Sequence, residues 1–382
     1  MKQFSFLKSV LQFEPSPGSK VVSVYLNTEA NENGKKVHDV FLRKQIAEHG
    51  AVMQEDSPER ASFDAAVEKI NSFVDKIDAS TRGVAVFAAA GSDELFEAFE
   101  FAVPFESDVF EIADRPYIRP IVQLVEQDPP FAVVAADSNK AHIYVFKRGH
   151  TIDRQKISNE TLSRTEAGGW SQMRYQRRID GFHQAHAKEV VAEVEKLVRD
   201  EGIDRVVLCG DEAVIIPMLR SELSKELSEK VVGTLSHNID TPENELAQAA
   251  AELLRSHDAE EDKAMIAQLV EQDYDRGRGV TGVETTLTAL LNGQVQELYM
   301  SASPEAVRYN RNEVRQVIAE YQPGEDSELP DPREARMVID ELLRRAAQTA
   351  DRIRFIEDPE LLAAAGGVGA LLRYQAKGVT NL

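Results

Sequence analysis

The pattern of apolar and polar positions predicts a chain in which short strands alternate with helices. Runs of apolar and β-branched residues predict buried strands. These strands are expected at residues 20–26, 83–88, 99–103, 109–112, 131–137, 141–146, 204–208, 231–235, 295–300 and 352–356. Apolar residues at helical spacing predict helices at residues 37–54, 57–77, 173–200, 211–227, 242–256, 282–292, 334–351 and 360–365. The predicted fold class is therefore α/β.

Proline and glycine refine this pattern. Pro217 is expected to interrupt the helix over residues 211–227, and Gly202 is expected to end the long helix before it. A turn at residues 138–140 is expected to join two strands into a hairpin. Residues 366–369 contain three glycines but lack the Lys-Ser/Thr pair of a phosphate-binding loop. They predict a tight turn that leads into a final edge strand.

Breaks in the pattern divide the chain into three predicted α/β domains. The pair Pro129-Pro130 follows the first group of strands and helices. A second change falls near residue 265, and an acidic loop rich in proline is expected at residues 322–332. The domains are therefore placed at residues 1–130, 131–265 and 266–382.

The composition indicates a cytoplasmic protein. Hydrophobic residues make up 42% of the 382 residues and charged residues 29%. No apolar run approaches the roughly 20 residues of a membrane-spanning helix, and residues 1–9 show no signal-peptide pattern. We therefore expect no membrane partner. The single cysteine, Cys209, lies in an apolar run and predicts a buried thiol.

The net charge of −21 argues against nucleic-acid binding by the surface as a whole, since phosphate binding rests on Lys and Arg. Residues 164–188 reverse this sign, because five cations against two acids give a local net charge of +3. Arg174, Arg177 and Arg178 are spaced to share one side of a helix. The start of that helix adds unpaired N–H groups and its positive dipole end. This stretch therefore predicts contact with RNA phosphates, and an ordinary solvated helix face is the alternative.

The residues before the arginines add further chemistry. Gly168-Gly169 allows backbone conformations that other residues resist. Trp170 could stack on a base or pack onto its own domain. Gln172 could position a water molecule at an ester bond or simply contact RNA. The predicted RNA-binding residues are Gly168, Gly169, Trp170, Ser171, Arg174, Arg177, Arg178 and Lys188. Gln172 is the candidate catalytic residue.

A metal site has little support in the sequence. His183 and His186 lie one helical turn apart, with Glu189 three residues further on. No Cys or third His is near in sequence, so surface or interface histidines are the default interpretation. We expect neither a metal nor a cofactor.

In the order of these motifs, most of the chain resembles the archaeal and eukaryotic class-I release factor and pelota superfamily. Release factors carry Gly-Gly-Gln-Ser-Ala-Leu-Arg-Phe where residues 168–175 read Gly-Gly-Trp-Ser-Gln-Met-Arg-Tyr. Residues 282–293 resemble the segment Gly-Val-x-x-Thr-Leu-x-Ala-Leu of the family, and residues 366–374 resemble its closing Gly-Gly-Ile-Gly-x-Ile-Leu-Arg-Tyr. The resemblance implies an RNase H-like middle domain and a C-terminal domain like the kink-turn-binding ribosomal proteins.

Departures from the family pattern bear on function. Trp170 stands where release factors have their hydrolytic Gln. The spacing of Gly169 and Gln172 resembles the Gly-x-x-Gln of the peptidyl-tRNA hydrolase branch of ribosome quality control. The first domain lacks the Asn-Ile-Lys-Ser and Tyr-x-Cys-x-x-x-Phe patterns that read stop codons, so stop-codon reading is not expected. The chain therefore resembles bacterial relatives that include Balon-like hibernation factors.

Two functions follow from this resemblance, and a third interpretation remains. In the first, the protein occupies the ribosomal A site in hibernation or rescue, with its Gly-Gly loop near the peptidyl-transferase centre. It would contact ribosomal RNA and the P-site tRNA, and a translational GTPase such as elongation factor Tu would be its partner. In the second, Gln172 helps to hydrolyse peptidyl-tRNA on stalled ribosomes. The third interpretation is a protein of this fold that does not act on the ribosome.

Overall fold

The computed structural model of the chain describes most of its 382 residues. The described residues are 4–16, 19–29, 37–78, 80–90, 94–101, 103–127, 129–147, 150–158, 170–274, 277–312, 314 and 332–374. At residues 147, 150–158, 170–180, 274, 332 and 333 the description covers the backbone alone. Contacts within the chain define two compact units. One combines residues 1–127 with 261–382, and the other comprises residues 128–260.

The N-terminal segment of the first unit is built on an antiparallel sheet in the order β3-β2-β1-β4. Its strands are β1 (Val21–Asn27), β2 (Gly83–Ala89), β3 (Leu95–Phe101) and β4 (Val109–Ala113). Its helices are η1 (Ser5–Leu7), α1 (Lys8–Gln12), α2 (His38–Val52), α3 (Pro58–Val74) and α4 (Arg119–Gln127). Alternate strand residues face opposite sides, so Val22 and Val24 pack with α2 and α3 while Val21 and Tyr25 pack with η1 and α1.

The C-terminal segment of the same unit contains a second sheet, in the order β10-β13-β11-β12. Its strands are β10 (Gly279–Thr281), β11 (Val295–Ser301), β12 (Arg352–Ile356) and β13 (Val368–Leu372). Its helices are α9 (Val283–Leu291), η2 (Pro304–Ala306), α11 (Pro332–Thr349) and η3 (Pro359–Ala365). β11 and β12 are parallel, whereas β13 runs antiparallel to both β10 and β11.

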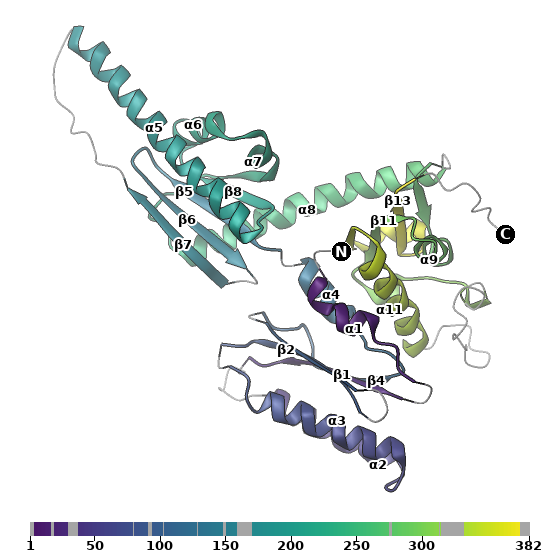
Figure 1. The fold of residues 1–382 in the computed structure, drawn as a ribbon. Helices are drawn as coiled ribbons and strands as arrows, with labels where there is room; N and C mark the ends of the chain where they lie inside the picture. Colours follow the sequence, from purple (N-terminus) through teal and green to yellow (C-terminus); the bar gives the residue numbers. More distant parts are fainter. Residues whose placement is uncertain are drawn as a thin grey trace. The chain divides into compact units, whose positions relative to one another are not determined.

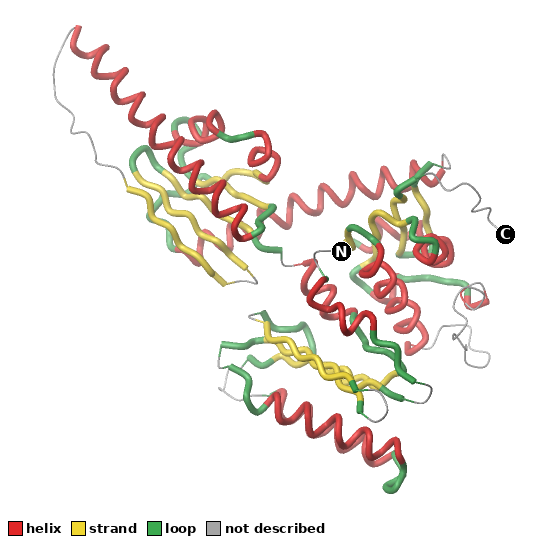
Figure 2. Tube along the Cα trace, in the orientation of Figure 1, coloured by secondary structure: helices red, strands yellow, loops and turns green. Residues whose placement is uncertain are grey.

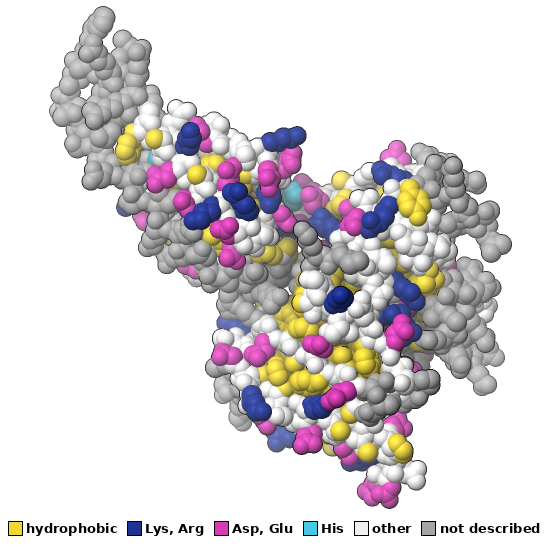
Figure 3. All heavy atoms as spheres, viewed as in Figure 1, with side chains coloured by type: hydrophobic (Ala, Val, Ile, Leu, Met, Phe, Trp, Pro, Cys, Tyr) yellow, Lys and Arg dark blue, Asp and Glu magenta, His cyan; other side chains and the backbone are white. Residues whose placement is uncertain are grey.

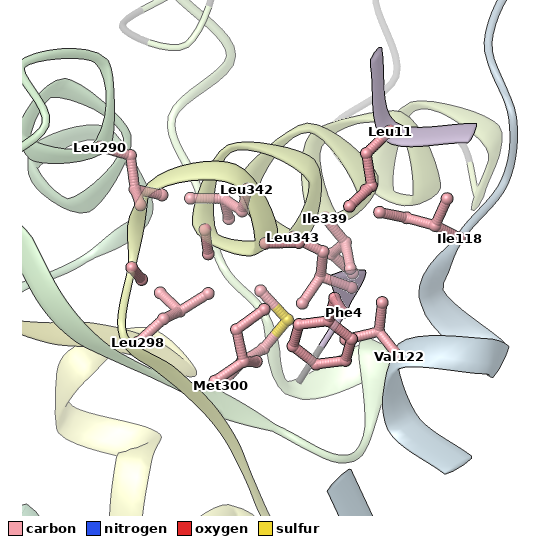
Figure 4. Close-up of a cluster of buried hydrophobic side chains, with 14 of the residues drawn as sticks. Phe4, Leu11, Ile118, Val122, Leu290, Leu298, Met300, Ile339, Leu342 and Leu343 are labelled. Atoms are coloured by element: carbon pink, nitrogen blue, oxygen red, sulfur yellow. The ribbon is translucent and has the colours of Figure 1, made fainter. Parts of the chain in front are cut away.

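One hydrophobic core joins these two segments, although they lie far apart in sequence. Figure 4 shows Phe4, Leu11 and Val122 of the N-terminal segment beside Met300 and Ile339 of the C-terminal segment. All five are buried. Burial of apolar surface stabilises by roughly 25 cal/mol per Å². The two segments therefore stabilise each other, and neither completes this core alone.

The second unit is a five-stranded sheet in the order β7-β6-β5-β8-β9 (Figures 1 and 2). Its strands are β5 (Phe131–Ala136), β6 (Lys140–Lys147), β7 (His150–Ser158), β8 (Arg205–Cys209) and β9 (Val231–Leu235). Its helices are α5 (Trp170–Glu201), α6 (Ile215–Glu222), α7 (Lys225–Lys230) and the first part of α8 (Glu243–Tyr274). α5 and α6 cover one face of the sheet, and α8 covers the other through Leu246, Ala250 and Leu254.

The predicted α/β class and many elements are confirmed, including the hairpin of β5 and β6 and the buried thiol of Cys209. Several expectations are corrected. Pro217 lies inside α6, where the first turn of a helix tolerates proline, and the break comes after Glu222. α8 continues from the expected end at residue 256 to Tyr274. β13 is an interior strand and not the expected edge strand. The three-domain division stays a prediction.

The expected acidic loop at residues 322–332 lies almost wholly outside the described residues. Among the helices of the described part of the chain, none combines the length and the apolar character that crossing a membrane would require.

Candidate functional site

The predicted site is arranged around the start of α5. This helix begins at Trp170, directly after Gly168 and Gly169, which both lie outside the described residues. Its backbone is helical without interruption to Glu201, although glycine at position 181 weakens a helix interior. In Figure 1 the N-terminal end of α5 extends beyond the strands of its own unit. The backbone of positions 170–172 of the motif therefore occupies the end of the helix that projects from the sheet.

The C-terminal half of α5 fixes which side of the helix faces the sheet. Ala187, Val190, Val194 and Leu197 are buried against the sheet at helical spacing. Gln184 Nε2 donates to Glu222 Oε1 over 3.1 Å and ties α5 to the end of α6. These contacts hold the helix at a defined rotation about its axis.

That rotation places the earlier positions of the helix by simple geometry. At about 3.6 residues per turn, eighteen residues complete five turns, so positions that far apart lie on the same side. Position 170 therefore lies on the side of Lys188, which is exposed. By the same spacing, position 174 lies on the side of Ala192 and position 178 on the side of Lys196, and both of these residues are exposed. The tryptophan and the basic positions thus fall on the side of α5 that faces away from the sheet.

Gln172 falls on a different side. Eighteen residues further on is Val190, which is 0% exposed and packs on the sheet. At about 100° per residue, positions 170 and 172 are separated by roughly 160° around the helix axis. A ligand lying along the basic side of α5 would therefore pass position 170 and not position 172.

The electrostatics of this end suit an anion. The first turn of α5 contains no acidic residue. Its unpaired N–H groups and the helix dipole favour negative charge there. On the face of the molecule drawn in Figure 3, Lys and Arg side chains are interspersed with Asp and Glu over the described residues. The described residues of this face therefore carry both signs of charge, whereas the sequence at residues 164–188 has a local net charge of +3.

The structure tests only part of the predicted site. Lys188 is the one predicted site residue whose side chain is described, and it is exposed. Trp170, Ser171, Gln172, Arg174, Arg177 and Arg178 are placed by their backbone alone. Their roles remain predictions. The sequence predicts that the paired histidines are surface or interface residues; His183 is half-buried, but His186 is 1% exposed and is therefore buried within its own unit.

A second polar cluster, in the unit of residues 1–127 and 261–382, was not predicted from the sequence. The Asp340 carboxylate on α11 accepts a hydrogen bond of 2.9 Å from the backbone N–H of Ile118, at the start of α4. Desolvation raises the pKa of Asp340 to about 7, against the lowering effect of the backbone N–H groups of Ile118 and Arg119. No sequence signal links these residues, because they lie 222 positions apart.

The neighbouring Glu341 is held by three guanidinium groups. It accepts from Arg344 over 2.8 Å and from Arg345 over 2.8 Å, and it pairs with Arg115 over 3.2 Å. Desolvation alone would raise its pKa, but Arg345 and Arg344 hold the pKa of Glu341 below its ordinary value. This network fixes α11 to the segment before α4.

Comparison with known proteins gives one family match. The sequence model of the bacterial archaeo-eukaryotic release factor family 10 matches residues 116–255. This range includes the Gly-Gly-Trp-Ser-Gln motif and the whole of α5.

Individual relatives extend the similarity over most of the chain. Peptide chain release factor subunit 1 of Methanobrevibacter smithii is 20% identical over 94% of this chain and 93% of its own length. An uncharacterised protein of Mycobacterium tuberculosis is 25% identical over 82% of this chain and 85% of its own. Among solved structures, Archaeoglobus fulgidus Pelota is 13% identical, with a TM-score of 0.33 over 78% of this chain and 80% of the other.

Proposed function

We propose that this chain, which belongs to the bacterial branch of the archaeal and eukaryotic release-factor and pelota superfamily, acts on the ribosome as a translation factor. It occupies the A site in hibernation or rescue, without reading stop codons, and its Gly-Gly loop lies near the peptidyl-transferase centre. Its ligands are ribosomal RNA and the P-site tRNA, and a translational GTPase such as elongation factor Tu is its partner. Its place of action is the cytoplasm.

The arrangement of α5 is the observation that carries this proposal. Positions 174, 178 and 188 fall on the side of the helix that faces away from the sheet, and position 170 lies with them. The described side chains on this side of α5 do not pack against the rest of the unit, since Lys188, Ala192 and Lys196 are exposed. A basic side that starts at a helix N-terminus suits the phosphates of a folded RNA. The net charge of −21 would otherwise repel the ribosome, so contact is expected to concentrate here.

Charge reversal on α5 tests the contact. We expect Arg174→Glu combined with Arg177→Glu to weaken ribosome binding by at least tenfold. The dependence of log affinity on log salt concentration should also become shallower by about two, roughly one for each lost phosphate contact. The measurement is co-sedimentation with purified ribosomes over a series of salt concentrations.

The matched control is Arg220→Glu with Lys225→Glu, which makes the same charge change at exposed positions of α6 and α7 in the same unit. We expect this pair to keep most of the affinity and the salt slope. Equal binding by both double variants and the unmodified protein would refute the proposed contact.

The alternative function is hydrolysis of peptidyl-tRNA. It is supported by the position of Gln172 in the first turn of α5, three residues after Gly169, where an end-on approach of a substrate could reach it. The opposite placement of positions 172 and 170 around the helix favours the binding function. A release assay on ribosomes that hold peptidyl-tRNA distinguishes the two. Release that disappears in Gln172→Ala would establish the hydrolase, whereas ribosome binding without release would exclude it.

A further inference from the structure

The unit formed by residues 1–127 and 261–382 contains an open cavity of about 570 Å³. It lies where the start of α4 and the loop before it meet the segment after β11. Apolar lining comes from Phe105, Tyr117, Leu124, Pro304 and Val307. A volume of this size is within the range of roughly 300–1,000 Å³ that small-molecule sites show in proteins. Both walls belong to one compact unit that shares a hydrophobic core.

Arg119 supplies a buried positive charge to this lining. Arg119 is 7% exposed, and its Nη2 donates a hydrogen bond to the backbone oxygen of Ala302. Its Nε is buried without a hydrogen-bond partner among the described residues. Desolvation lowers the pKa of the guanidinium, but arginine stays charged at neutral pH. A buried donor without an acceptor costs free energy, and a buried guanidinium is stabilised when an anion comes to lie beside it.

The other charged residues that line the cavity form an ion pair or a hydrogen bond, or are exposed to solvent. Arg336 Nη1 pairs with Glu111 over 2.9 Å, and Arg308 Nη1 donates to the backbone oxygen of Glu305 over 2.5 Å. Glu106 and Glu305 are exposed to solvent, and with Tyr117 they raise the pKa of the Arg119 guanidinium against the larger lowering effect of desolvation. Among the described cations that line the cavity, Arg119 is thus the buried one. Its Nε–H makes no hydrogen bond within the described residues, and aromatic and aliphatic side chains lie beside the residue.

We propose that this cavity is a binding site for a small amphipathic anion, in which an aromatic or aliphatic body packs on Phe105, Tyr117 and Leu124 and an anionic oxygen pairs with the guanidinium of Arg119. The site is separate from the α5 stretch and independent of ribosome binding, so it is tested on the purified full-length protein alone.

The fluorescent probe 8-anilinonaphthalene-1-sulfonate has this chemistry, because it joins an aromatic body to a sulfonate. We expect saturable binding of one molecule per chain, measured by fluorescence and by calorimetry. Arg119→Met, which removes the guanidinium, should weaken binding by at least tenfold. Leu124→Trp, which fills the cavity and leaves Arg119 in place, should abolish the site. Arg352→Gln removes an exposed guanidinium of the same unit and should bind like the unmodified protein.

Hydrogen exchange on the unmodified protein provides a measurement that needs no variant. The bound probe should slow amide exchange in α4 and leave exchange in α2 unchanged. Near-ultraviolet circular dichroism confirms that each variant is folded. The proposal is overturned if the unmodified protein shows no saturable binding, if both cavity variants bind as it does, or if protection appears away from α4.

Discussion

At the residue scale, Asp340 is held in an uncommon environment for a carboxyl group. It receives the backbone N–H of Ile118 at the start of α4, and desolvation raises its pKa to about 7. The folded protein therefore binds this proton more tightly than the unfolded chain, whose Asp pKa lies near ~4. The contribution to stability is complete below the unfolded pKa and is lost as the pH rises through the folded pKa.

Asp340→Asn should remove this pH dependence while keeping an oxygen that accepts from Ile118. Between about pH 4 and pH 7, the free energy of unfolding of the unmodified protein should fall relative to that of the variant. Above about pH 7 this difference in unfolding free energy should level off at about 4 kcal/mol. The folded pKa of about 7 lies roughly 3 units above the unfolded pKa, and each unit corresponds to about 1.4 kcal/mol. Urea unfolding at a series of pH values measures it. Asp75→Asn makes the same change at an exposed position. Asp75→Asn should show the same dependence of unfolding free energy on pH as the unmodified protein. If Asp340→Asn shows that same dependence, the raised pKa of Asp340 does not control stability and this account is wrong.

The sequence indicated neither Asp340 nor Arg119 as a special residue. Both acquire their environments from contacts between segments about 200 residues apart, Asp340 with Ile118 and Arg119 with Ala302. Local pattern reasoning finds residues whose chemistry is shared with near neighbours in the chain. The basic positions of α5 are of that kind, so their common side of the helix could be predicted from spacing alone.

At the element scale, α5 shows how packing overrides a local break. Gly181 costs about 1 kcal/mol relative to alanine in a helix interior, yet the helix continues through it. A Cβ at this position would meet no atom within 4 Å. The buried stripe from Ala187 to Val198 begins only after it. The helix is therefore secured from its C-terminal half toward the motif.

Gly181→Ala should raise the free energy of unfolding of the unit by up to about 1 kcal/mol, because alanine favours the helix and has room. Gly202→Ala should lower it by about 1–2 kcal/mol, because Gly202 ends α5 with a φ of +65° that disfavours a side chain. Urea unfolding of residues 128–260 gives both values. The same sign of change for the two variants would contradict this interpretation of α5.

The elements that the sequence missed have a common physical reason. α4 follows Pro116 and contains Pro120, which read as loop residues, yet Pro120 lies in the first turn, where its missing N–H costs little. β7 carries polar residues at most positions, as an edge strand can. β13 is interior because β10, a strand of only three residues, pairs with its other side. Apolar runs identify central strands, but pairing partners decide which strand is the edge.

At the scale of the whole molecule, the two units differ in how they close their cores. Residues 128–260 form about 130 residues with cores on both faces of one sheet, which is a usual domain size. The other unit draws one core from residues at both ends of the chain, including Phe4 and Leu372. The middle of the chain is thus self-sufficient in its packing, and the N-terminal segment is not.

Excised fragments should behave accordingly. A fragment of residues 128–260 should fold alone and unfold cooperatively in urea, as followed by circular dichroism. A fragment of residues 1–127 should be strongly destabilised or aggregate, because the face formed by residues such as Phe4, Leu11 and Ile118 loses its partners. Adding residues 261–382 as a separate chain should restore it. Stable, cooperative folding of the N-terminal fragment alone would show that the shared core is dispensable.

The shared core also imposes an order on biosynthesis. The ribosome that makes this protein exposes Phe4 long before β13, which ends at Leu372. At roughly 5–20 residues per second, tens of seconds pass between the emergence of residue 127 and that of β13. During this time the middle unit can finish folding while the first segment keeps an apolar face in contact with solvent or with a chaperone. The segment before residue 128 is therefore made before the middle unit but reaches its native state after it.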